Sequence, residues 1–298
     1  MSAIPFVRDL TFDYGQADQV SPLVQRVIAN NPGPFTFTGT GVYIIGDKTC
    51  TIIDPGPNQA DHFEALKRIL DGRELTCVLV THSHMDHSPL AHPLAQWAGC
   101  KVYAGGPVIP TECEVRLEAG DDLSFKPDET LTDGQLFQGP GWTIEAIATP
   151  GHTSNHFCFA LREENALFSG DHIMGWSTTV ISPPDGDMGD YFDSLEKVKS
   201  REFSTIWPTH GPPVTDVAPF VDGYITHRRA REQAIIDRLN AGDRTIPQMV
   251  KTIYKDVDKR LHPAACHSVL SHMIHLVRSG RARANGDVGS LSTEFTPL

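Results

Sequence analysis

The stretch THSHMDH at residues 81–87 places three histidines and one aspartate directly after the apolar run 77–80. A continuous apolar run of this kind is typical of a strand buried on both faces. Side chains alternate along extended backbone, so His82 and His84 can point their imidazoles the same way. The turn that follows presents the aspartate and the third histidine to a neighbouring point. One loop can therefore address two metal ions.

A single histidine is more often a packed or surface residue than a ligand, but four potential ligands within six residues reverse that preference. Further candidates stand where other apolar runs meet glycine or proline: they are His152 in TPGHT, Asp171 in SGDH and His210 in PTHG. Side chains at such positions project over the edge of a sheet. In this order after HxHxDH, they predict a two-metal site.

The composition is that of a soluble globular protein. Of the 298 residues, 40% are hydrophobic and 21% are charged, which excludes a disordered chain, a coiled coil and collagen. No apolar run approaches the ~18 residues of a membrane span, and the first ten residues lack the basic start and apolar stretch of a secretory signal. We therefore expect a cytoplasmic protein with no membrane partner.

The first part of the chain combines short apolar runs with helical patterns. The predicted strands are 42–45, 50–53, 77–80, 102–104, 142–148, 156–161, 166–168 and 205–207. A helical pattern at 63–70 lies between the second and third of them. Mixed strands and helices at this spacing indicate a layered α/β or α+β domain, which we place at residues 1–215.

The sequence pattern changes from about residue 216. Amphipathic helices are predicted at 224–239, 246–254 and 265–276. A hairpin follows, with strands at 281–284 and 288–291 joined by an Asn-Gly-Asp turn. Three helices and a small hairpin predict a winged-helix-like second domain at residues 216–298.

Charge is unevenly shared between the two parts of the chain. The net charge is −12; residues 1–223 contain 13 Lys and Arg against 30 Asp and Glu, whereas residues 224–298 contain 12 against 7. An acidic bulk disfavours broad nucleic-acid adhesion, and a basic tail leaves room for a local contact. The basic grouping consists of Arg228, Arg229, Arg231, Arg278, Arg281 and Arg283. It is either a solvated helix face and wing or a nucleic-acid contact.

Over residues 35–213 these motifs resemble the metallo-β-lactamase superfamily. Asp54, in the turn DPG, matches an early acidic turn of that family, which usually supports the fold or the ligands. The C-terminal part, with HRRxRE at 227–232, resembles the winged-helix domain of a β-lactamase-like group that includes endoribonucleases. The resemblance implies an α+β fold: a four-layer αββα sandwich with metals at one edge between the sheets, followed by a small winged-helix-like helical domain.

The resemblance also implies which residues bind metal, since all seven ligand positions of the family are filled. The first ion would be held by His82, His84 and His152. The second ion would be held by Asp86, His87 and His210, and Asp171 would bridge the two. Imidazole nitrogens and carboxylates suit zinc, so two Zn²⁺ per chain are expected. A hydroxide shared between the ions would be the nucleophile, with Asp86 and Asp171 as the catalytic carboxylates.

Comparison of this sequence with three subgroups of the family narrows the substrate class. Diiron redox members normally place Glu where His84 stands, and secreted antibiotic-hydrolysing members usually carry Cys or Ser where Asp171 stands. Glyoxalase-type thioesterases share the ligands but typically have a different helical C-terminal region. The leading hypothesis is therefore hydrolysis of a phosphodiester such as single-stranded RNA, and the alternative is an acyl bond of a β-lactam, lactone or thioester. A nucleic-acid-binding protein with an inactive metal domain is the third hypothesis.

Two further features stand close to the ligand motifs. His156 and His172 are candidates to support the ligands. The polar Gly/Pro segment 176–191, just beyond Asp171, is either a substrate-facing loop or a plain connection. Winged helices also form dimer contacts or the walls of a substrate cleft. The partners that the sequence suggests are therefore a small-molecule or RNA substrate and a second copy of the chain.

Overall fold

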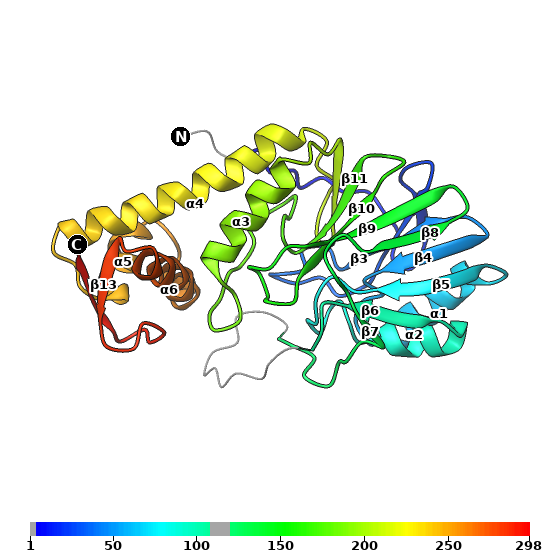
Figure 1. Ribbon diagram of the computed structural model, residues 1–298, viewed down its shortest axis with the longest axis horizontal. Helices are drawn as coiled ribbons and strands as arrows, with labels where there is room; N and C mark the ends of the chain where they lie inside the picture. Colours follow the sequence, from blue (N-terminus) through cyan, green and yellow to red (C-terminus); the bar gives the residue numbers. More distant parts are fainter. Residues whose placement is uncertain (1–3, 108–119) are drawn as a thin grey trace.

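The computed structural model describes residues 4–107 and 120–298. Two β-sheets face each other, helices cover both outer faces, and a group of helices with a two-stranded ribbon follows at the C-terminal end (Figure 1). The predicted α+β class is therefore confirmed. Within these two ranges, no helix combines the length and the apolar character needed to cross a membrane.

The first sheet contains seven strands in chain order. They are β1 (Ala17–Gln19), β2 (Val24–Ile28), β3 (Gly41–Gly46), β4 (Thr49–Ile53), β5 (Glu74–Leu79), β6 (Lys101–Ala104) and β7 (Glu129–Thr130). Neighbours from β1 to β4 are antiparallel, and neighbours from β4 to β7 are parallel. Parallel pairs need crossover connections, and α1 (Ala60–Leu70) and α2 (Ala91–Ala98) provide two of these. Their apolar sides pack on the outer face of this sheet.

The second sheet contains five strands in the order β12-β11-β10-β9-β8. They are β8 (Leu136–Gly139), β9 (Trp142–Ala148), β10 (Phe157–Leu161), β11 (Ala166–Gly170) and β12 (Thr205–Pro208). Only the β11–β12 pair in this sheet is parallel. The helices α3 (Met188–Lys199) and α4 (Val217–Asn240) cover its outer face.

Large side chains from both sheets fill the space between them. Tyr43 of β3, Trp142 of β9 and Phe168 of β11 belong to one buried cluster, and the rings of Tyr43 and Phe168 lie 5.0 Å apart. Burying aromatic surface in this way is the main stabilising contribution of the interface between the sheets. The strands predicted for the first part of the chain all recur, with ends shifted by a few residues at most, and the four layers confirm the predicted αββα sandwich.

The C-terminal region contains the three predicted helices and a ribbon. After α4 come α5 (Ile246–Ile253), the 3₁₀ turn η1 (Lys259–Leu261), α6 (His262–Arg278), β13 (Ala282–Asn285) and β14 (Glu294–Pro297). The hairpin prediction is wrong in its second strand, because β13 pairs with 294–297 and not with 288–291. The reason lies at Asp287, whose carboxylate accepts from the Gly289 amide at 2.9 Å and whose carbonyl accepts from the Thr293 hydroxyl. These local bonds stabilise a longer loop in place of a tight turn.

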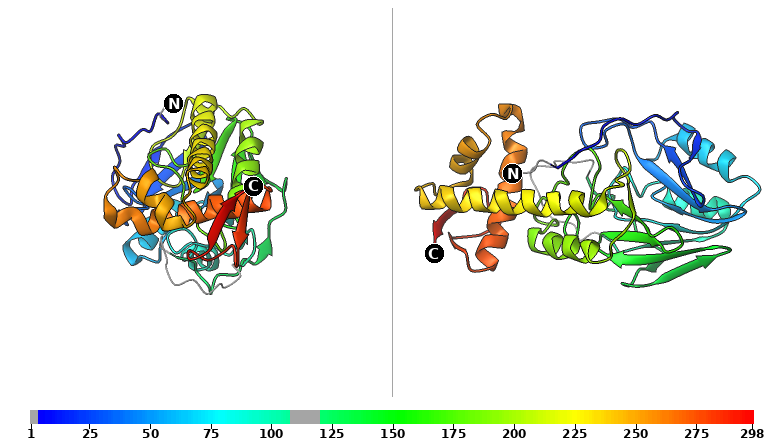
Figure 2. Two further views of the ribbon diagram at one scale, coloured as in Figure 1. Left: turned by 90° about the vertical axis from the view of Figure 1, so that its left-hand side faces the viewer. Right: turned by 90° about the horizontal axis from the view of Figure 1, so that it is seen from above.

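Helix α4 contributes to two separate hydrophobic cores. Its first half packs Phe220, Val221 and Tyr224 into the core outside the second sheet. Its last turns pack Ile235 and Leu239 into the core formed with α5 and α6. The views in Figure 2 show α4 running as one straight rod from the sandwich to the C-terminal helices. One rigid helix therefore connects the sandwich to the C-terminal region, whose boundary at residue 216 stays a prediction.

Side chains of α4 also hold the segment that follows β11. The Tyr224 hydroxyl lies 2.7 Å from the Met174 carbonyl and 2.5 Å from the Ser177 carbonyl, and it accepts from the Met174 amide at 3.1 Å. One turn further along, the buried Arg228 donates to the Thr179 carbonyl. The backbone of 174–179 is therefore fixed by the helix rather than by its own secondary structure.

Replacing Tyr224 by Phe removes the hydroxyl but keeps the packed ring. Because buried carbonyl and amide groups lose their partner, we expect the free energy of unfolding to fall by about 1 to 3 kcal/mol. Urea denaturation measures the change. The matched control is Tyr14→Phe, which removes an exposed hydroxyl bonded to the Thr38 carbonyl at 2.9 Å and should change stability by less than about 0.5 kcal/mol. Equal effects of the two substitutions would show that the Tyr224 contacts add nothing.

A buried carboxylate joins α4, α6 and the ribbon. Glu232 lies 2.9 Å from Arg281 Nη1, 3.6 Å from His275 Nε2 and 3.7 Å from His272 Nδ1. Burial lowers the pKa of His272 to about 4, although Glu232 acts in the opposite direction, and the guanidinium of Arg228 lowers it further. His272 is therefore neutral in the folded protein near neutral pH.

The lowered pKa of His272 makes folding sensitive to acid. An unfolded chain binds a proton on this histidine below about pH 6.5, whereas the folded chain does so only near pH 4. The stability that this group contributes is thus present above pH 6.5 and is lost as the pH falls towards 4. Between pH 7 and pH 5, we expect the free energy of unfolding to fall by about 1 to 2 kcal/mol less in His272→Gln than in the wild type. Denaturant titrations at both pH values measure this, and identical losses would contradict the expectation.

Candidate metal centre

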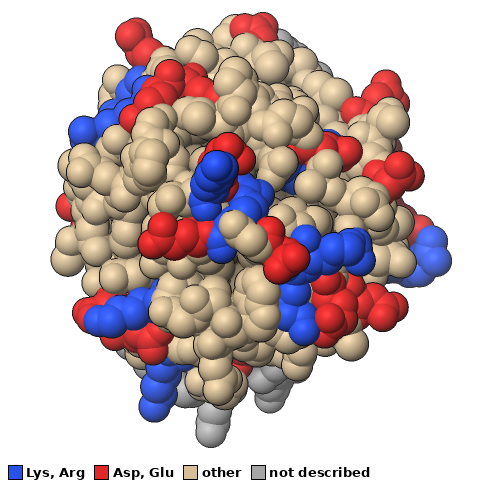
Figure 3. Space-filling model, turned by 90° about the vertical axis from the view of Figure 1, so that its right-hand side faces the viewer, with Lys and Arg blue, Asp and Glu red and all other residues tan. Residues whose placement is uncertain are grey.

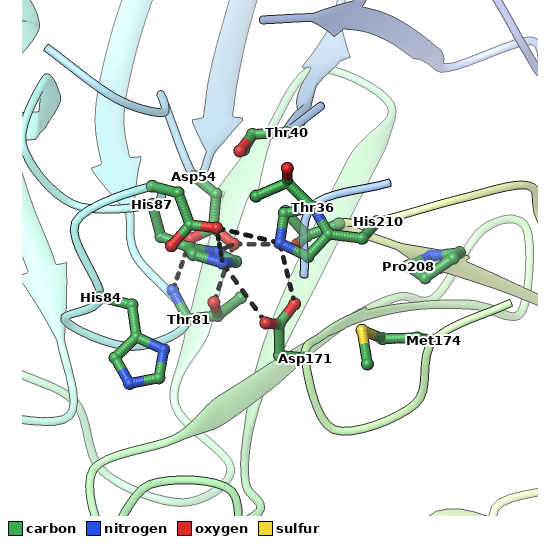
Figure 4. A network of polar contacts seen from close by, with 12 residues as sticks. Thr36, Thr40, Asp54, Thr81, His84, His87, Asp171, Met174, Pro208 and His210 are labelled. Atoms are coloured by element: carbon green, nitrogen blue, oxygen red, sulfur yellow. Dashed lines mark hydrogen bonds and ion pairs between the residues drawn. The ribbon is translucent and has the colours of Figure 1, made fainter. Parts of the chain in front are cut away.

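The side chains named by the sequence motifs converge at one edge of the sandwich, between the two sheets. The stretch 81–87 follows β5 of the first sheet, whereas His152, Asp171 and His210 follow β9, β11 and β12 of the second. All seven predicted ligands are buried. Figure 4 shows Asp171, His87 and His210 pointing toward one another from these different strands. The structure therefore brings together every metal ligand that was predicted from the sequence.

The first group of potential ligands contains three histidines and a carboxylate. His82 Nε2 lies 2.9 Å from His84 Nδ1, and His152 Nε2 lies 3.3 Å from the same atom. Asp171 Oδ2 lies 3.8 Å from His152 Nε2. One ligand atom of each residue lies within 4.8 Å of the others, a spacing that admits an ion between them.

The second group contains Asp86, His87 and His210. His210 Nε2 lies 3.2 Å and His87 Nε2 3.7 Å from Asp86 Oδ2. The carboxylate of Asp171 reaches this group as well, because its Oδ1 lies 3.4 Å from His210 Nε2 and its Oδ2 lies 3.7 Å from His87 Nε2. Asp171 thus stands between the two groups, at the place of a bridging carboxylate.

Contacts on the far side of the histidine rings set which nitrogen carries the proton. His87 Nδ1 donates to Asp54 Oδ2 at 2.9 Å. Thr81 Oγ1 donates to that same carboxylate oxygen at 2.7 Å, so it accepts from His82 Nδ1 at 3.0 Å. When these rings are neutral, as in a metal ligand, Nε2 is therefore left with a lone pair that faces the centre.

The same arrangement holds for histidines from the second sheet. His152 Nδ1 donates to the Val180 carbonyl at 2.7 Å, and His210 Nδ1 donates to the Gly39 carbonyl at 3.2 Å. His84 is turned over: its Nε2 lies 3.6 Å from Asp121 Oδ1, and its Nδ1 faces the first group. Five imidazoles consequently direct acceptor nitrogens at the centre, which is what a cation requires.

Asp54 supports the ligands without belonging to either group. It is fully buried and has a positive φ of 49°. Its carboxylate accepts from the Thr81 amide at 2.7 Å and from the Thr209 hydroxyl at 3.1 Å, in addition to the Thr81 hydroxyl and His87. Four donors thus satisfy the oxygens of this buried carboxylate. This role agrees with the supporting position that the sequence assigned to the DPG turn.

Electrostatics within the site differ between the two groups. Burial lowers the pKa of His84 to about 3 and holds the pKa of His82 well below its usual value. Burial opposes protonation of His87 too, but the carboxylates of Asp86 and Asp171 outweigh it and raise the pKa of His87 well above its usual value. Burial thus disfavours the protonated forms of His82 and His84 in the first group, whereas the carboxylates of the second group favour a positive charge beside them.

The donor set fits divalent metal ions. Within the described part of the chain, His87 Nε2, His210 Nε2 and Asp171 Oδ1 are buried and have no hydrogen-bond partner. Leaving such atoms unpaired costs free energy, and a bound cation satisfies all of them at once. Imidazole nitrogen and carboxylate oxygen are the donors that zinc and similar transition metals accept.

These findings agree with comparisons to known proteins. The family model of the metallo-beta-lactamase superfamily matches residues 36–210, more than half of the chain. The chain belongs to the metallo-β-lactamase superfamily. The model of the beta-lactamase associated winged helix domain matches residues 245–290, which confirms the winged helix expected in the C-terminal part.

Curated relatives of this superfamily member cover most of its length. A "Beta-lactamase-like protein 2 homolog" of Caenorhabditis elegans is 32% identical, over 88% of this chain and 87% of its own. An "Atrochrysone carboxyl ACP thioesterase" of Cryptosporiopsis is 31% identical, over 80% of this chain and 74% of its own. Membership and these relatives together make the chain a metal-dependent hydrolase of the metallo-β-lactamase superfamily.

Solved structures share the complete fold. A beta-lactamase domain protein from Burkholderia ambifaria aligns with 97% of this chain over 96% of its own length. The TM-score is 0.79 and the sequences are 19% identical. A metallo-beta-lactamase family protein from Thermus thermophilus covers 94% of this chain and is itself covered in full, with a TM-score of 0.72 and 18% identity. The sandwich and the C-terminal region thus recur together in other metallo-β-lactamase proteins.

Sequence reasoning found some supporting residues of the metal centre and missed others. His156 Nε2 accepts from the Asp171 amide at 3.3 Å, and its Nδ1 lies 2.9 Å from Thr149 Oγ1, so it holds the backbone of the aspartate that lies between the two groups. The ring of His172 instead packs against Tyr191, with centroids 5.0 Å apart. The backbone carbonyls that orient the ligand histidines were missed, because main-chain contacts leave no signature in the sequence.

The grouping of ligands predicts two bound ions per chain at saturating zinc, and His84→Ala should lower this stoichiometry to about one. The reason is that His84 belongs to the first group only. Metal analysis after dialysis against buffered zinc gives the number. The control is His92→Ala, whose ring contacts the Lys126 carbonyl at 2.7 Å away from both groups and which should keep two ions. A wild type that binds one ion at saturation would contradict the prediction.

Proposed function

We propose that this chain is a dinuclear zinc hydrolase whose substrate is an acyl compound, with a thioester as the preferred class. The complete set of five imidazoles and two carboxylates supports zinc as the metal. Two relatives that are named carboxyl ACP thioesterases, at 30% and 31% identity, support the thioester. The choice of an acyl substrate over a phosphodiester rests on the contacts that the arginines of the C-terminal part already make within the protein.

Two of these arginines are used inside the protein. Arg228 is buried and donates to the Thr179 carbonyl. Arg281 pairs with the buried carboxylate of Glu232 at 2.9 Å. Neither side chain stands ready for a phosphate backbone, because each would first have to give up its internal partner.

The remaining arginines do not form a continuous basic track. Arg229 and Arg278 each pair with a carboxylate, on α3 and at the start of α3 respectively. Arg231 lies over the Tyr254 ring, 4.2 Å from its centroid. On the face of the sandwich remote from the winged helix, positive and negative side chains are interspersed (Figure 3). Binding of single-stranded RNA gains from a positive groove that extends over several nucleotides, and these dispersed, mostly paired side chains do not form one. Their arrangement therefore favours a small acyl substrate.

Hydrolysis of single-stranded RNA is the second candidate function. What favours it is the winged-helix match at residues 245–290 and the excess of basic residues in 224–298. Arg283, at the surface of the ribbon, is the member of the basic grouping best placed for a phosphate. In this alternative the same metal centre would cleave a phosphodiester.

The residues of the site have distinct tasks in the proposed reaction. His82, His84 and His152 would hold one ion, and Asp86, His87 and His210 the other. Bound zinc would lower the pKa of water and polarise the carbonyl of the substrate. The carboxylate of Asp171 keeps both oxygens between the groups, and its pKa is held well below the usual range because His210 and His87 outweigh the effect of burial. Asp171 is thus ionised at any working pH and offsets positive charge in the centre.

A substrate panel on zinc-loaded protein tests the proposal. The panel contains a thioester, a lactone, a chromogenic cephalosporin and single-stranded RNA. We expect turnover to be highest with the thioester, and we expect Asp171→Asn to lower kcat at least about 100-fold on every substrate that is cleaved, because the bridging charge is lost. The control Asp193→Asn, an exposed position on α3, should keep the activity. RNA cleavage without thioester hydrolysis would replace the acyl proposal by the second candidate.

A further inference from the structure

A cavity of about 380 Å³ lies between the segment 177–181 and the winged-helix region. One wall is formed by the segment itself, and the other walls come from α4 and from residues 254–268. Ligand sites in proteins start at about 300 Å³, so the volume suits a small organic molecule. Neither the family comparisons nor the proposed metal chemistry assigns a role to this cavity.

The cavity carries basic side chains, and no carboxylate lines it within residues 4–107 and 120–298. Three basic side chains line it, His227, Arg228 and Arg231. Within the described part of the chain, Arg228 Nε and His227 Nδ1 are buried and have no hydrogen-bond partner. Arg228 is only 4% exposed, so its charge is poorly hydrated. Buried cationic groups of this kind are stabilised by an anion.

The lowered pKa of His227 also indicates positive charge in this cavity. Burial and, after it, the charges of Arg228 and Arg231 lower the pKa of His227 to about 4. The neighbouring guanidiniums therefore add to burial in disfavouring a protonated His227. In a chain with a net charge of −12, such positive charge is a local feature of this cavity.

Most of the remaining lining residues are apolar, beside a few serines and threonines. Val180 and Ile181 contribute from the segment after β11, and Leu261, Ala264 and Ala265 contribute from the winged-helix side. An inorganic ion would leave these surfaces in contact with water. A molecule with an apolar body and one anionic group covers both parts of the lining.

The cavity adjoins the metal centre through two segments of backbone. Val180 lines the cavity, and its carbonyl accepts from His152 at 2.7 Å. Phe35 also lines it, and the same loop carries Gly39, whose carbonyl accepts from His210 at 3.2 Å. A molecule held in the cavity thus lies beside the backbone that orients one histidine of each metal group.

We propose that this cavity binds the anionic end of the substrate, an oxyanion on an apolar body, while the bond to be cleaved lies at the metal centre. The inference rests on the acyl hydrolase proposed above and adds a residue that selects the substrate, Arg231. In thioesters the oxyanion can be a carboxylate on the acyl group or a phosphate on the thiol carrier. Both offer the same chemistry to a guanidinium.

Three thioesters distinguish a carboxylate on the acyl group from a phosphate on the thiol carrier. Benzoyl N-acetylcysteamine carries no charge, its 4-carboxybenzoyl analogue carries a carboxylate on the acyl group, and benzoyl coenzyme A carries phosphates on the thiol. We expect Arg231→Gln to raise the KM of a charge-bearing ester about tenfold more than that of the neutral ester, because a charge-assisted contact is lost. The ester that responds identifies the source of the oxyanion, and equal changes for all three would overturn the proposal.

Two further variants control this measurement. Arg229→Gln removes a charge two positions away on α4, where the side chain pairs with Glu196 at the surface, and it should leave the KM ratios unchanged. Arg231→Lys keeps the charge and should retain most of the selectivity. Thermal unfolding of each variant establishes that the winged-helix region stays folded. A response of Arg229→Gln equal to that of Arg231→Gln would count against a specific site.

Direct binding separates a failure of this inference from a failure of the acyl proposal. Calorimetric titration of the wild type with terephthalate and with coenzyme A should show binding of at least one of them, which Arg231→Gln weakens about tenfold. If none of the thioesters is hydrolysed, the acyl proposal is wrong, and the calorimetry still decides whether the cavity binds an organic oxyanion. Absence of binding to both probes would refute the site.

Discussion

The buried carboxylate of Asp54 is the contact on which the arrangement of the site depends. It follows β4 and accepts hydrogen bonds from Thr81, after β5, and from Thr209, after β12 of the other sheet. A buried charge is expensive unless its oxygens are satisfied, so these strand ends are held together at a fixed separation. The same carboxylate orients His87. The hydrogen bonds of one buried carboxylate thus shape the edge where the sheets meet before any ligand is bound.

A second constraint follows from the histidines, since rings whose acceptor nitrogens face one another repel unless a cation lies between them. The structure resists this repulsion with contacts from distant segments, such as the carbonyls of Val180 and Gly39. The segment around Val180 is in turn held by Tyr224 and Arg228 of α4. Because α4 also belongs to the core of the winged-helix region, rigidity passes from that region to the metal centre through one helix.

The sequence determines the ligand set and most of the strands for a simple reason. Ligands cluster in short motifs at strand ends, and buried strands are continuous apolar runs, so both leave local signals. Four strands, β1, β2, β7 and β8, escaped prediction. The edge strands β1, β7 and β8 are short and contain no buried residue, and in β2 the polar pair Gln25 and Arg26 interrupts the apolar run. The second strand of the ribbon was misplaced because a loop stabilised by Asp287 cannot be told from a tight turn by composition. Pairings such as Arg281 with Glu232 join positions far apart in sequence, and so only the fold reveals that this charge is not free.

The location of selectivity follows from the chemistry of the centre. Imidazoles and carboxylates that hold two ions provide the same Lewis acid for an ester, a thioester or a phosphodiester, so the ligands cannot discriminate among substrates. Discrimination has to come from groups that contact the parts of the substrate that do not react. Such groups have to lie close to the metal centre and also border a space for the substrate. The segment 177–181 does both, because it contacts a ligand histidine on one side and lines a cavity with Arg228 and Arg231 on the other. On the proposal that this cavity holds the substrate, the winged-helix region acts on catalysis by forming one of its walls, and a change in its packing would change which substrate is held rather than how its bond is broken.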